Sequence, residues 1–162
     1  MIGTRSILAV LGFLFLAPGA ACRGAGEGDW VVTRPADVAR GELEFRFVAE
    51  DPAKASLQVT GPDGETLGVE KEVVISSSDV HEVHVNLAGD SEHYAVTLYF
   101  TPQGAQRLRD ATDRNLGRQM AVMVNGLVLV APRLQSRLGP SAMIAASYTK
   151  EEAEKLAQQL AP

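Results

Sequence analysis

The stretch Tyr94–Gly117, YAVTLYFTPQGAQRLRDATDRNLG, decides the fold because its periodicity changes from that of a strand to that of a helix. Tyr94–Phe100 is β-prone and alternates two sets of side chains, which predicts a half-buried strand. Thr101 can cap a helix, and Pro102 falls in the first helical turn, where proline is tolerated. Gly117 suits the C-terminal stop of that helix. The helix has an apolar stripe formed by Ala105, Leu108, Ala111 and Leu116.

A hairpin is expected directly after this helix. Asn125-Gly126 stands between two β-prone runs, 119–124 and 127–134. This dipeptide is a strong hairpin signal, because both of its residues tolerate the positive φ that a two-residue turn needs. Pro132 indicates that the second strand ends there or lies at a sheet edge, since proline has no N–H to donate to a neighbouring strand.

The C-terminal part predicts one more strand and one more helix. Ala142–Tyr148 is the expected strand. Thr149 and Glu152 then have the spacing of a capping box, in which each residue satisfies a backbone N–H of the other. Apolar residues recur at i, i+3, i+4 and i+7, which is the pattern of one helix face. They are Ala153, Leu156, Ala157 and Leu160.

Upstream, the pattern is that of strands and turns. Residues 43–47 and 83–87 alternate apolar and polar side chains, and residues 69–75 are a further candidate strand. Turns are expected at residues 61–64 (GPDG) and 89–91 (GDS). The fold class expected from all these elements is α+β, a mostly antiparallel sheet with two helices packed on one face.

The composition excludes several functional classes. The chain has 162 residues, which allows about one domain. Its 46% apolar and 22% charged residues argue against a disordered chain. A net charge of −5 and the lack of any Lys/Arg block argue against a nucleic-acid-binding protein. A single cysteine excludes an intramolecular disulfide framework.

The N-terminus has the pattern of an export signal. Arg5 is followed by the apolar run Ile7–Leu16 and by the small residues of Ala17–Ala21. The run has ten residues, whereas a helix needs about 20 to span a bilayer. No later segment approaches that length, so any membrane association is expected to come from a lipid or from a partner.

Cys22 is the expected lipidation site. Gly19-Ala20-Ala21-Cys22 resembles the lipobox of bacterial lipoproteins, with Gly19 where leucine is usual. The alternative is cleavage by the ordinary signal peptidase, because Gly19 and Ala21 also satisfy its small-x-small rule. The expected organisation is a lipoprotein-type signal peptide at 1–21, a flexible tether at 22–40 and a folded domain at 41–162. Within the tether, residues 30–32 (WVV) are a candidate short docking element.

Candidate catalytic and metal-binding groups are sparse. His81 and His84 are three residues apart on an expected strand, so their side chains should point to opposite faces. With only His93 remaining, no metal-ligand spacing is present. Residues 76–78 (SSS) near Asp79 lack the Gly-x-Ser-x-Gly elbow of a hydrolase and are interpreted as a polar turn. We expect no enzymatic activity, no catalytic residues, no metal site and no cofactor.

Four other charged residues have ordinary explanations. Glu151 and Glu152 fall in the first turn of the expected last helix, where negative charge is favourable. Arg133 and Arg137 could form a small basic spot for an acidic partner, although paired surface charges are the better explanation.

Residues 73–160 resemble the head subdomain of the first periplasmic domain of SecD, a subunit of the Sec protein-export machine. The landmarks keep their order and spacing, which is more specific than any one short motif. They are Ser78-Asp79-Val80, Val96–Ala105, Thr112–Asn115, Gly117–Val122, Asn125-Gly126, Ala131-Pro132, Tyr148–Ala153 and Leu156-Ala157, with Leu43–Val48 similar to an upstream strand. SecD proteins usually have Asp-Gly in place of Asn125-Gly126, and both pairs suit the same turn.

The resemblance implies a polypeptide ligand. The expected protein is a non-catalytic, membrane-anchored envelope module that contacts exported polypeptides or the export machinery. It would lie on the periplasmic side of the bacterial envelope, held by lipid at the inner or the outer membrane, with no nucleic-acid or small-molecule partner. The alternative is a structural envelope lipoprotein with one fixed protein partner. A sheet edge near Pro132 or the groove between the two helices could accept an extended peptide, and individual binding residues are left unassigned.

Overall fold

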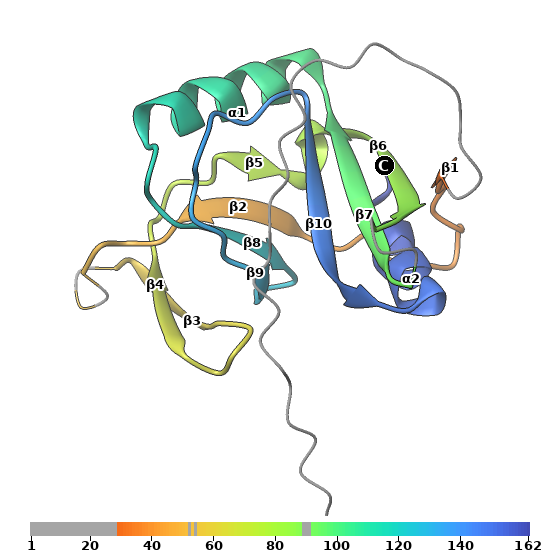
Figure 1. Ribbon diagram of the computed structural model, residues 1–162, viewed down its shortest axis with the longest axis horizontal. Coiled ribbons are helices and arrows are strands. Elements are labelled where there is room, and N and C mark those ends of the chain that lie inside the picture. Colours follow the sequence, from red (N-terminus) through yellow and green to blue (C-terminus); the bar gives the residue numbers. More distant parts are fainter. Residues whose placement is uncertain (1–28, 52, 54, 89–91) are drawn as a thin grey trace, which may run out of the picture.

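The fold, as described by a computed structural model, consists of two four-stranded antiparallel sheets and a separate hairpin (Figure 1). The structure describes residues 29–162 except 52, 54 and 89–91. Sheet A has the strand order β1-β6-β7-β10. Its strands are β1 (Asp29–Val31), β6 (Val80–Leu87), β7 (Tyr94–Phe100) and β10 (Ser141–Tyr148).

Sheet B has the order β5-β2-β8-β9 and is packed on both faces. Its strands are β2 (Leu43–Phe47), β5 (Ile75–Ser76), β8 (Met120–Val124) and β9 (Leu127–Val130). One face of β8 contributes Met120, Val122 and Val124 to the main core. The other face contributes Ala121 and Met123 to a smaller cluster with the hairpin of β3 (Leu57–Thr60) and β4 (Thr66–Val69). All five residues of β8 are therefore buried.

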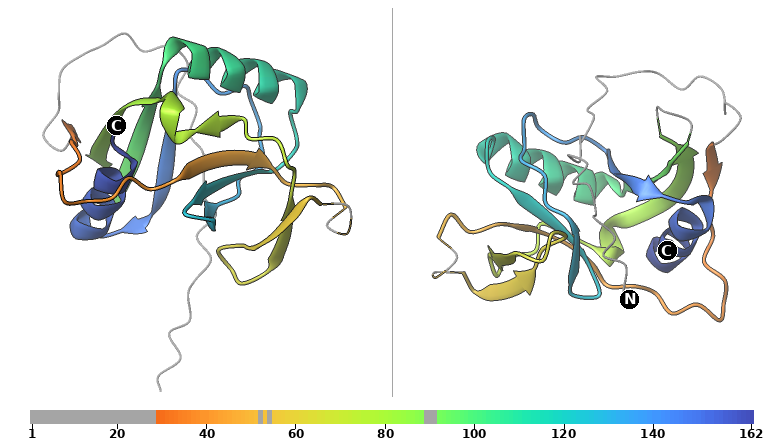
Figure 2. Two further views of the ribbon diagram at one scale, coloured as in Figure 1. Left: turned by 180° about the vertical axis from the view of Figure 1, so that it is seen from behind. Right: turned by 60° about the horizontal axis from the view of Figure 1, so that its bottom comes forward.

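Both helices begin as the sequence predicts. In α1 (Pro102–Arg114), the Thr101 side chain accepts a hydrogen bond from the backbone N–H of Gly104. In α2 (Lys150–Leu160), Thr149 and Glu152 form the reciprocal capping box. Figures 1 and 2 show the two helices at different ends of the domain, with α2 against β6, β7 and β10 and α1 near β5.

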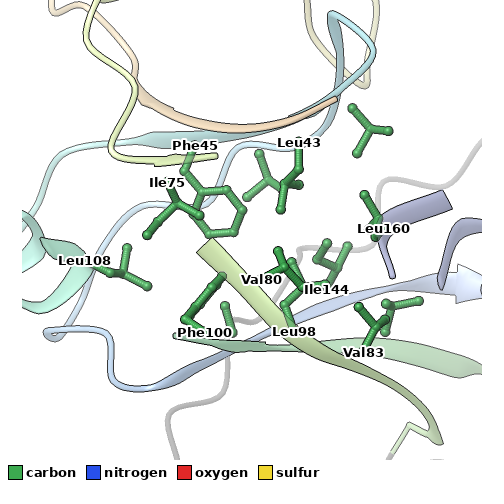
Figure 3. Close-up of a cluster of buried hydrophobic side chains, with 14 of the residues drawn as sticks. Leu43, Phe45, Ile75, Val80, Val83, Leu98, Phe100, Leu108, Ile144 and Leu160 are labelled. Atoms are coloured by element: carbon green, nitrogen blue, oxygen red, sulfur yellow. The ribbon is translucent and has the colours of Figure 1, made fainter. Parts of the chain in front are cut away.

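One core joins the two sheets and both helices. Figure 3 shows side chains from β2 and β5 facing those of β6, β7 and β10, with Leu108 of α1 at one end and Leu160 of α2 at the other. Phe45 and Phe100 meet edge to face, with ring centroids 5.8 Å apart. Both helices bury their apolar stripes here, so the predicted α+β class with antiparallel strands and two helices is confirmed. The strands are divided among three sheets, not gathered in the one sheet that was expected.

The start of the folded part differs from the expectation. β1 pairs with β6 from Asp29↔Asn86 to Val31↔His84, and Val32 is buried in the main core. We expected a tether as far as residue 40 and a domain from residue 41, but residues 29–32 are docked on the domain, whereas residues 33–40 form no helix or strand and are mostly exposed. The candidate docking element at residues 30–32 does dock: Trp30 and Val31 belong to the edge strand β1, and Val32 follows it into the core.

Three local predictions are corrected by the structure. Residues 69–75 are not one strand: β4 ends at Val69 and β5 begins at Ile75, because the chain changes sheets between them. Leu116 lies beyond α1 and is 52% exposed, so it does not continue the apolar stripe. β9 ends at Val130, four residues earlier than expected, although Pro132 does follow an edge strand. The expected turn at 89–91 lies outside the described residues.

Candidate functional site

An apolar cleft lies between the outer strand of sheet B, β9, and the outer strand of sheet A, β10. We call it the edge cleft. The space within it that can hold solvent is about 10 Å³, which is room for about one water molecule. None of its lining side chains is ionisable. They are Phe45, Met120, Val122, Val130, Pro132, Leu134, Leu138, Ala142, Met143 and Ile144.

The hairpin β8–β9 forms one side of the edge cleft. Asn125 and Gly126 adopt φ of 52° and 79°, the pair of positive values that the predicted two-residue turn requires. This turn sets the register in which Val130 pairs with Val122, with one bulge between them and the turn. Leu127, at the start of β9, is 66% exposed. Within the described chain no strand pairs with the outer side of β9.

Strand β10 forms the other side. It pairs with β7 from Ser141↔Tyr99 to Ala145↔Ala95, and its register shifts before Tyr148. No strand of the described residues lies along its outer side. Its sequence, SAMIAASY, contains no charged residue and no proline. Edge strands are commonly protected by such residues, and an unprotected edge is a template for another strand.

The loop between β9 and β10 lines part of the edge cleft and is held in place by backbone hydrogen bonds. The backbone N–H of Leu134 donates to the carbonyl of Arg118 at 2.8 Å, and the N–H of Gly117 donates to the carbonyl of Leu134 at 2.8 Å. The N–H of Leu138 donates to the buried Thr112 hydroxyl at 2.9 Å. Leu134 and Leu138 are therefore fixed wall residues, anchored to the end of α1 and the segment that follows it.

The chemistry of this lining is that of binding. General acid–base and nucleophilic catalysis need an ionisable or activated group at the reacting atom, and the edge cleft supplies none. What it supplies is apolar surface beside two edge strands, whose outer sides pair with no strand among the described residues. Such a combination matches an extended peptide, which carries both backbone groups and alternating side chains.

The serine-rich turn beside Asp79 is structural, as predicted. The backbone N–H of Ser76 donates to Asp79 Oδ2 at 3.0 Å, and Ser77 Oγ accepts from the N–H of Leu43 at 2.7 Å. Asp79 is 6% exposed and forms an ion pair with Arg107. This turn joins β5, β6 and the start of α1, and its carboxylate is fully occupied by those partners.

The histidines are not brought together as a metal site. A bulge at His81 breaks the alternation of β6, so that Val80 and Val83 are both buried while His81 is exposed. His84 lies among Asp29, Glu82 and Tyr99. In the part of the chain that the structure describes, no group of three His, Cys, Asp or Glu side chains could hold a metal ion.

The remaining candidates have local roles or lie elsewhere. Arg133 donates to the carbonyl of Gly117 at 2.5 Å, and Arg137 is exposed. Glu152 serves the capping box, and Cys22 lies outside the described residues. The prediction that a groove between the two helices could accept a peptide is wrong, because α1 and α2 lie at different ends of the domain (Figures 1 and 2).

The tyrosine at the end of β10 has a displaced pKa. Tyr148 ends β10 and lies beside the first turn of α2. Burial raises the pKa of its phenol above the ordinary value of 10.0, and the nearby Glu152 carboxylate raises it further. The phenol is therefore neutral at physiological pH.

Sequence reasoning found one side of this site. Pro132 marked the β9 edge, whereas the contribution of β10 was missed. The available signal was the lack of charge and proline over residues 141–148, which distinguishes an unprotected edge only once the strand order is known. No described helix is long and apolar enough to cross a membrane.

Comparison with known proteins gives a consistent result. The family model for the SecDF P1 head subdomain matches residues 54–161. Protein translocase subunit SecD of Elusimicrobium minutum is 34% identical over 89 residues, which cover 55% of this chain and 19% of that protein. The SecD subunit of Acidaminococcus fermentans is 38% identical over 90 residues, covering 55% and 21%. That of Syntrophobacter fumaroxidans is 37% identical over 136 residues, covering 72% and 26%.

Solved structures share the fold. A crystal structure of SecDF in a super-membrane-facing form superposes with a TM-score of 0.58 at 22% identity, over 76% of this chain and 19% of that one. A structure of SecDF described as a membrane component that enhances protein export gives 0.56 at 23% identity, over 76% and 64%. The chain spans about a fifth of the curated relatives' length. Because the family model covers more than half of the chain, this protein belongs to the family of SecDF P1 head subdomains.

Proposed function

We propose that this chain is a non-catalytic, membrane-anchored envelope module that binds extended segments of exported polypeptides, or components of the export machinery, in the edge cleft. The observation that carries the proposal is the apolar lining placed between the unpaired edges of β9 and β10. Membership of a family whose relatives are translocase subunits supports the choice of ligand.

The two parts of the site would recognise different features of a polypeptide. Backbone N–H and C=O groups along β10 would pair with those of an added strand, which requires no particular sequence. In such a strand successive side chains point to opposite faces, so every second one would lie over the apolar lining of the edge cleft. This combination suits a binding partner that is unfolded and varied in sequence, with apolar residues at alternate positions.

Lipidation at Cys22 is the proposed anchor. Acyl chains on that residue would hold the domain at the periplasmic side of the envelope, since each buried CH₂ contributes about 0.8 kcal/mol. Signal cleavage before Cys22 would leave residues 23–28 between the anchor and β1.

In-cell photocrosslinking tests the proposal. A photoreactive residue is placed at Val130 in the edge cleft, at Leu127 on the same strand but at its exposed start, and at Lys155 on the exposed side of α2. We expect crosslinks from position 130 to many different exported chains or to translocon subunits, with far fewer from position 155. Position 127 shows how far the contact extends along β9.

The opposite result would also be informative. A single envelope protein crosslinked repeatedly from all three positions would overturn the proposal. It would make the chain a structural envelope lipoprotein that uses the same fold for one fixed partner.

A further inference from the structure

The charges of the chain are distributed unevenly around the edge cleft. Residues 114–150 contain five basic side chains and no acidic one, although the whole chain has 20 Asp and Glu residues and a net charge of −5. This segment includes both strands that border the cleft, β9 and β10, and it supplies every lining residue except Phe45. The edge cleft is therefore built almost entirely from a long basic segment of an otherwise acidic chain.

Three of the five basic side chains are engaged with other parts of the molecule. Two form ion pairs, and the third donates a hydrogen bond to a carbonyl of its own helix. The contacts are Arg118 with Glu70, Lys150 with Glu154, and Arg114 Nε with the carbonyl of Asp110 at 2.9 Å. These three charges are thus partly or wholly committed within the domain.

The other two basic side chains, Arg133 and Arg137, are exposed. Neither forms an ion pair with a carboxylate of the described residues, whose ion pairs involve other basic groups. Arg133 donates to the neutral carbonyl of Gly117, which leaves its positive charge uncompensated. The paired surface charges that the sequence favoured for these two arginines are therefore absent from the described part of the chain.

Both arginines stand beside wall residues of the edge cleft. Arg133 lies between Pro132 and Leu134, and Arg137 precedes Leu138, and these three neighbours all line the cleft. Figure 1 shows the segment that carries them running from β9 past α1 to β10. Since consecutive Cα atoms are about 3.8 Å apart, the two charges belong to the rim of the cleft at the end formed by this loop.

Acidic residues adjoin the opposite ends of the same strands. The carbonyl of Glu42 accepts from the N–H of Asn125, in the hairpin turn where β9 begins, at 2.9 Å. Glu152 lies in the first turn of α2, just after Tyr148 ends β10. The loop with the two arginines instead joins the end of β9 to the start of β10. The edge cleft therefore has a positive end at this loop.

We propose that the edge cleft prefers extended polypeptide segments in which acidic residues accompany the apolar ones, with the acidic residues placed toward Arg133 and Arg137. This inference rests on the proposed function, because it names the class of polypeptide that the same cleft takes. In a bound strand every second side chain would lie over the apolar lining, so the intervening side chains are available to the rim. Rim charges act mainly on the rate of encounter and on selectivity, and salt screens them.

Three fluorescent peptides test the preference. They share one set of apolar residues at alternate positions and carry Glu, Gln or Lys at the intervening positions. Binding to the full chain carrying Cys22→Ser is followed by fluorescence anisotropy at about 30 mM and about 500 mM salt. At low salt we expect the Glu peptide to bind about two- to tenfold more tightly than the Gln peptide, which is the range for two exposed charge pairs. The Lys peptide should bind more weakly than the Gln peptide, and high salt should largely remove both differences.

The net charge of the protein makes this order a demanding one. A chain with a net charge of −5 would, as a whole, attract the Lys peptide and repel the Glu peptide. The order expected from the rim is the reverse. Non-specific electrostatic attraction to the protein surface therefore cannot imitate the expected result.

Removal of the rim charges locates the preference. The double variant Arg133→Gln/Arg137→Gln should bind the Glu peptide no more tightly than the Gln peptide, with its affinity for the Gln peptide unchanged. Arg137→Gln alone, which breaks no described hydrogen bond, should lose part of the preference. Lys155→Gln removes a positive charge from the exposed side of α2 and is the matched control, which should keep the preference. Urea unfolding shows whether the double variant is folded, because Arg133 also bonds to Gly117.

Two results would overturn this inference and leave the proposed function standing. One is binding of the three peptides with equal affinity, or with the Lys peptide tightest, at low salt. The other is a preference for the Glu peptide that survives in both Arg137→Gln and the double variant. Failure of all three peptides to bind would instead count against polypeptide binding in the edge cleft, and the inference would fall with it.

Discussion

Gly104 offers the sharpest stability prediction, because it allows α1 to approach the turn that holds Asp79. It is the third residue of α1, and its N–H is bound by the Thr101 cap. A Cβ added at this position would lie 2.8 Å from Asp79 Cβ and 3.3 Å from both Cγ and the backbone oxygen of Asp79. Gly104→Ala therefore forces either the helix or the turn to move.

Asp79 has little freedom to yield. Its carboxylate accepts from the backbone of Ser76 and pairs with Arg107, and its carbonyl accepts from the N–H of Thr101 at 2.8 Å. Overpacking at such a site costs about 1–3 kcal/mol. Alanine at a helical position regains at most about 1 kcal/mol relative to glycine. The net expectation is a loss of about 1–2 kcal/mol in the free energy of unfolding.

Urea unfolding followed by far-ultraviolet circular dichroism measures this loss. At this chain length it corresponds to a fall in Tm of about 3–6 °C. Gly139→Ala is the matched control, since a Cβ there meets nothing within 4 Å and its φ is not in the left-handed region. We expect that control within about 0.5 kcal/mol of the wild type. If Gly104→Ala unfolds with the same m-value and equal or greater stability, the close packing of α1 on Asp79 is refuted.

Three further predictions concern the hairpin turn, the edge cleft and the half-buried phenol of Tyr148. Gly126→Ala places a side chain at φ +79° and should cost about 1–2 kcal/mol of unfolding free energy, checked by urea unfolding; no loss would contradict the assigned turn. Val130→Arg introduces a charge into the edge cleft and should weaken binding of an extended apolar peptide at least about tenfold by fluorescence anisotropy. Leu127→Arg, exposed on the same strand, should leave that affinity unchanged, and equal losses would refute the cleft as the binding site. Because the folded-state pKa of Tyr148 is raised, the stability linked to its neutral phenol is present below about pH 10 and lost as the pH rises through the folded-state pKa. Tyr148→Phe should show a shallower alkaline loss of Tm, and an unchanged slope would remove that explanation.

Local elements were predictable because their signals are local. The caps of both helices depend on side chains three residues from the groups they bind, as Thr101 and Thr149 show. The tight turn at Asn125-Gly126 depends on two adjacent residues that tolerate positive φ. The alternation of Leu43, Phe45 and Phe47 needed only the two-residue period of a strand. Each of these features is determined by interactions within a few residues.

Errors arose where the outcome depended on distant parts of the chain. Residues 69–75 have the composition of a strand, but they cross from the hairpin to sheet B, and nothing in their own sequence says which sheet will accept them. Residues 29–32 fall in the segment expected to be a tether; residues 30–32 were a candidate docking element, but only the open edge of β6 and a place in the core show where they dock. The alternation predicted for residues 83–87 holds, whereas the bulge at His81, just before it, is set by the pairing with β7.

The sequence by itself determined the α+β class, the helix ends, the hairpin turn and the resemblance to the SecDF P1 head, because periodicity, capping and motif order are written along the chain. Only the tertiary structure decided the edge cleft and the docking of β1. The edge cleft exists because β9 and β10 are the outer strands of different sheets, and strand order is fixed by long-range pairing. The docking of β1 on β6 brings Asp29 to His84, 55 residues away. Contacts of that range depend on how apolar surfaces pack, which no local pattern encodes.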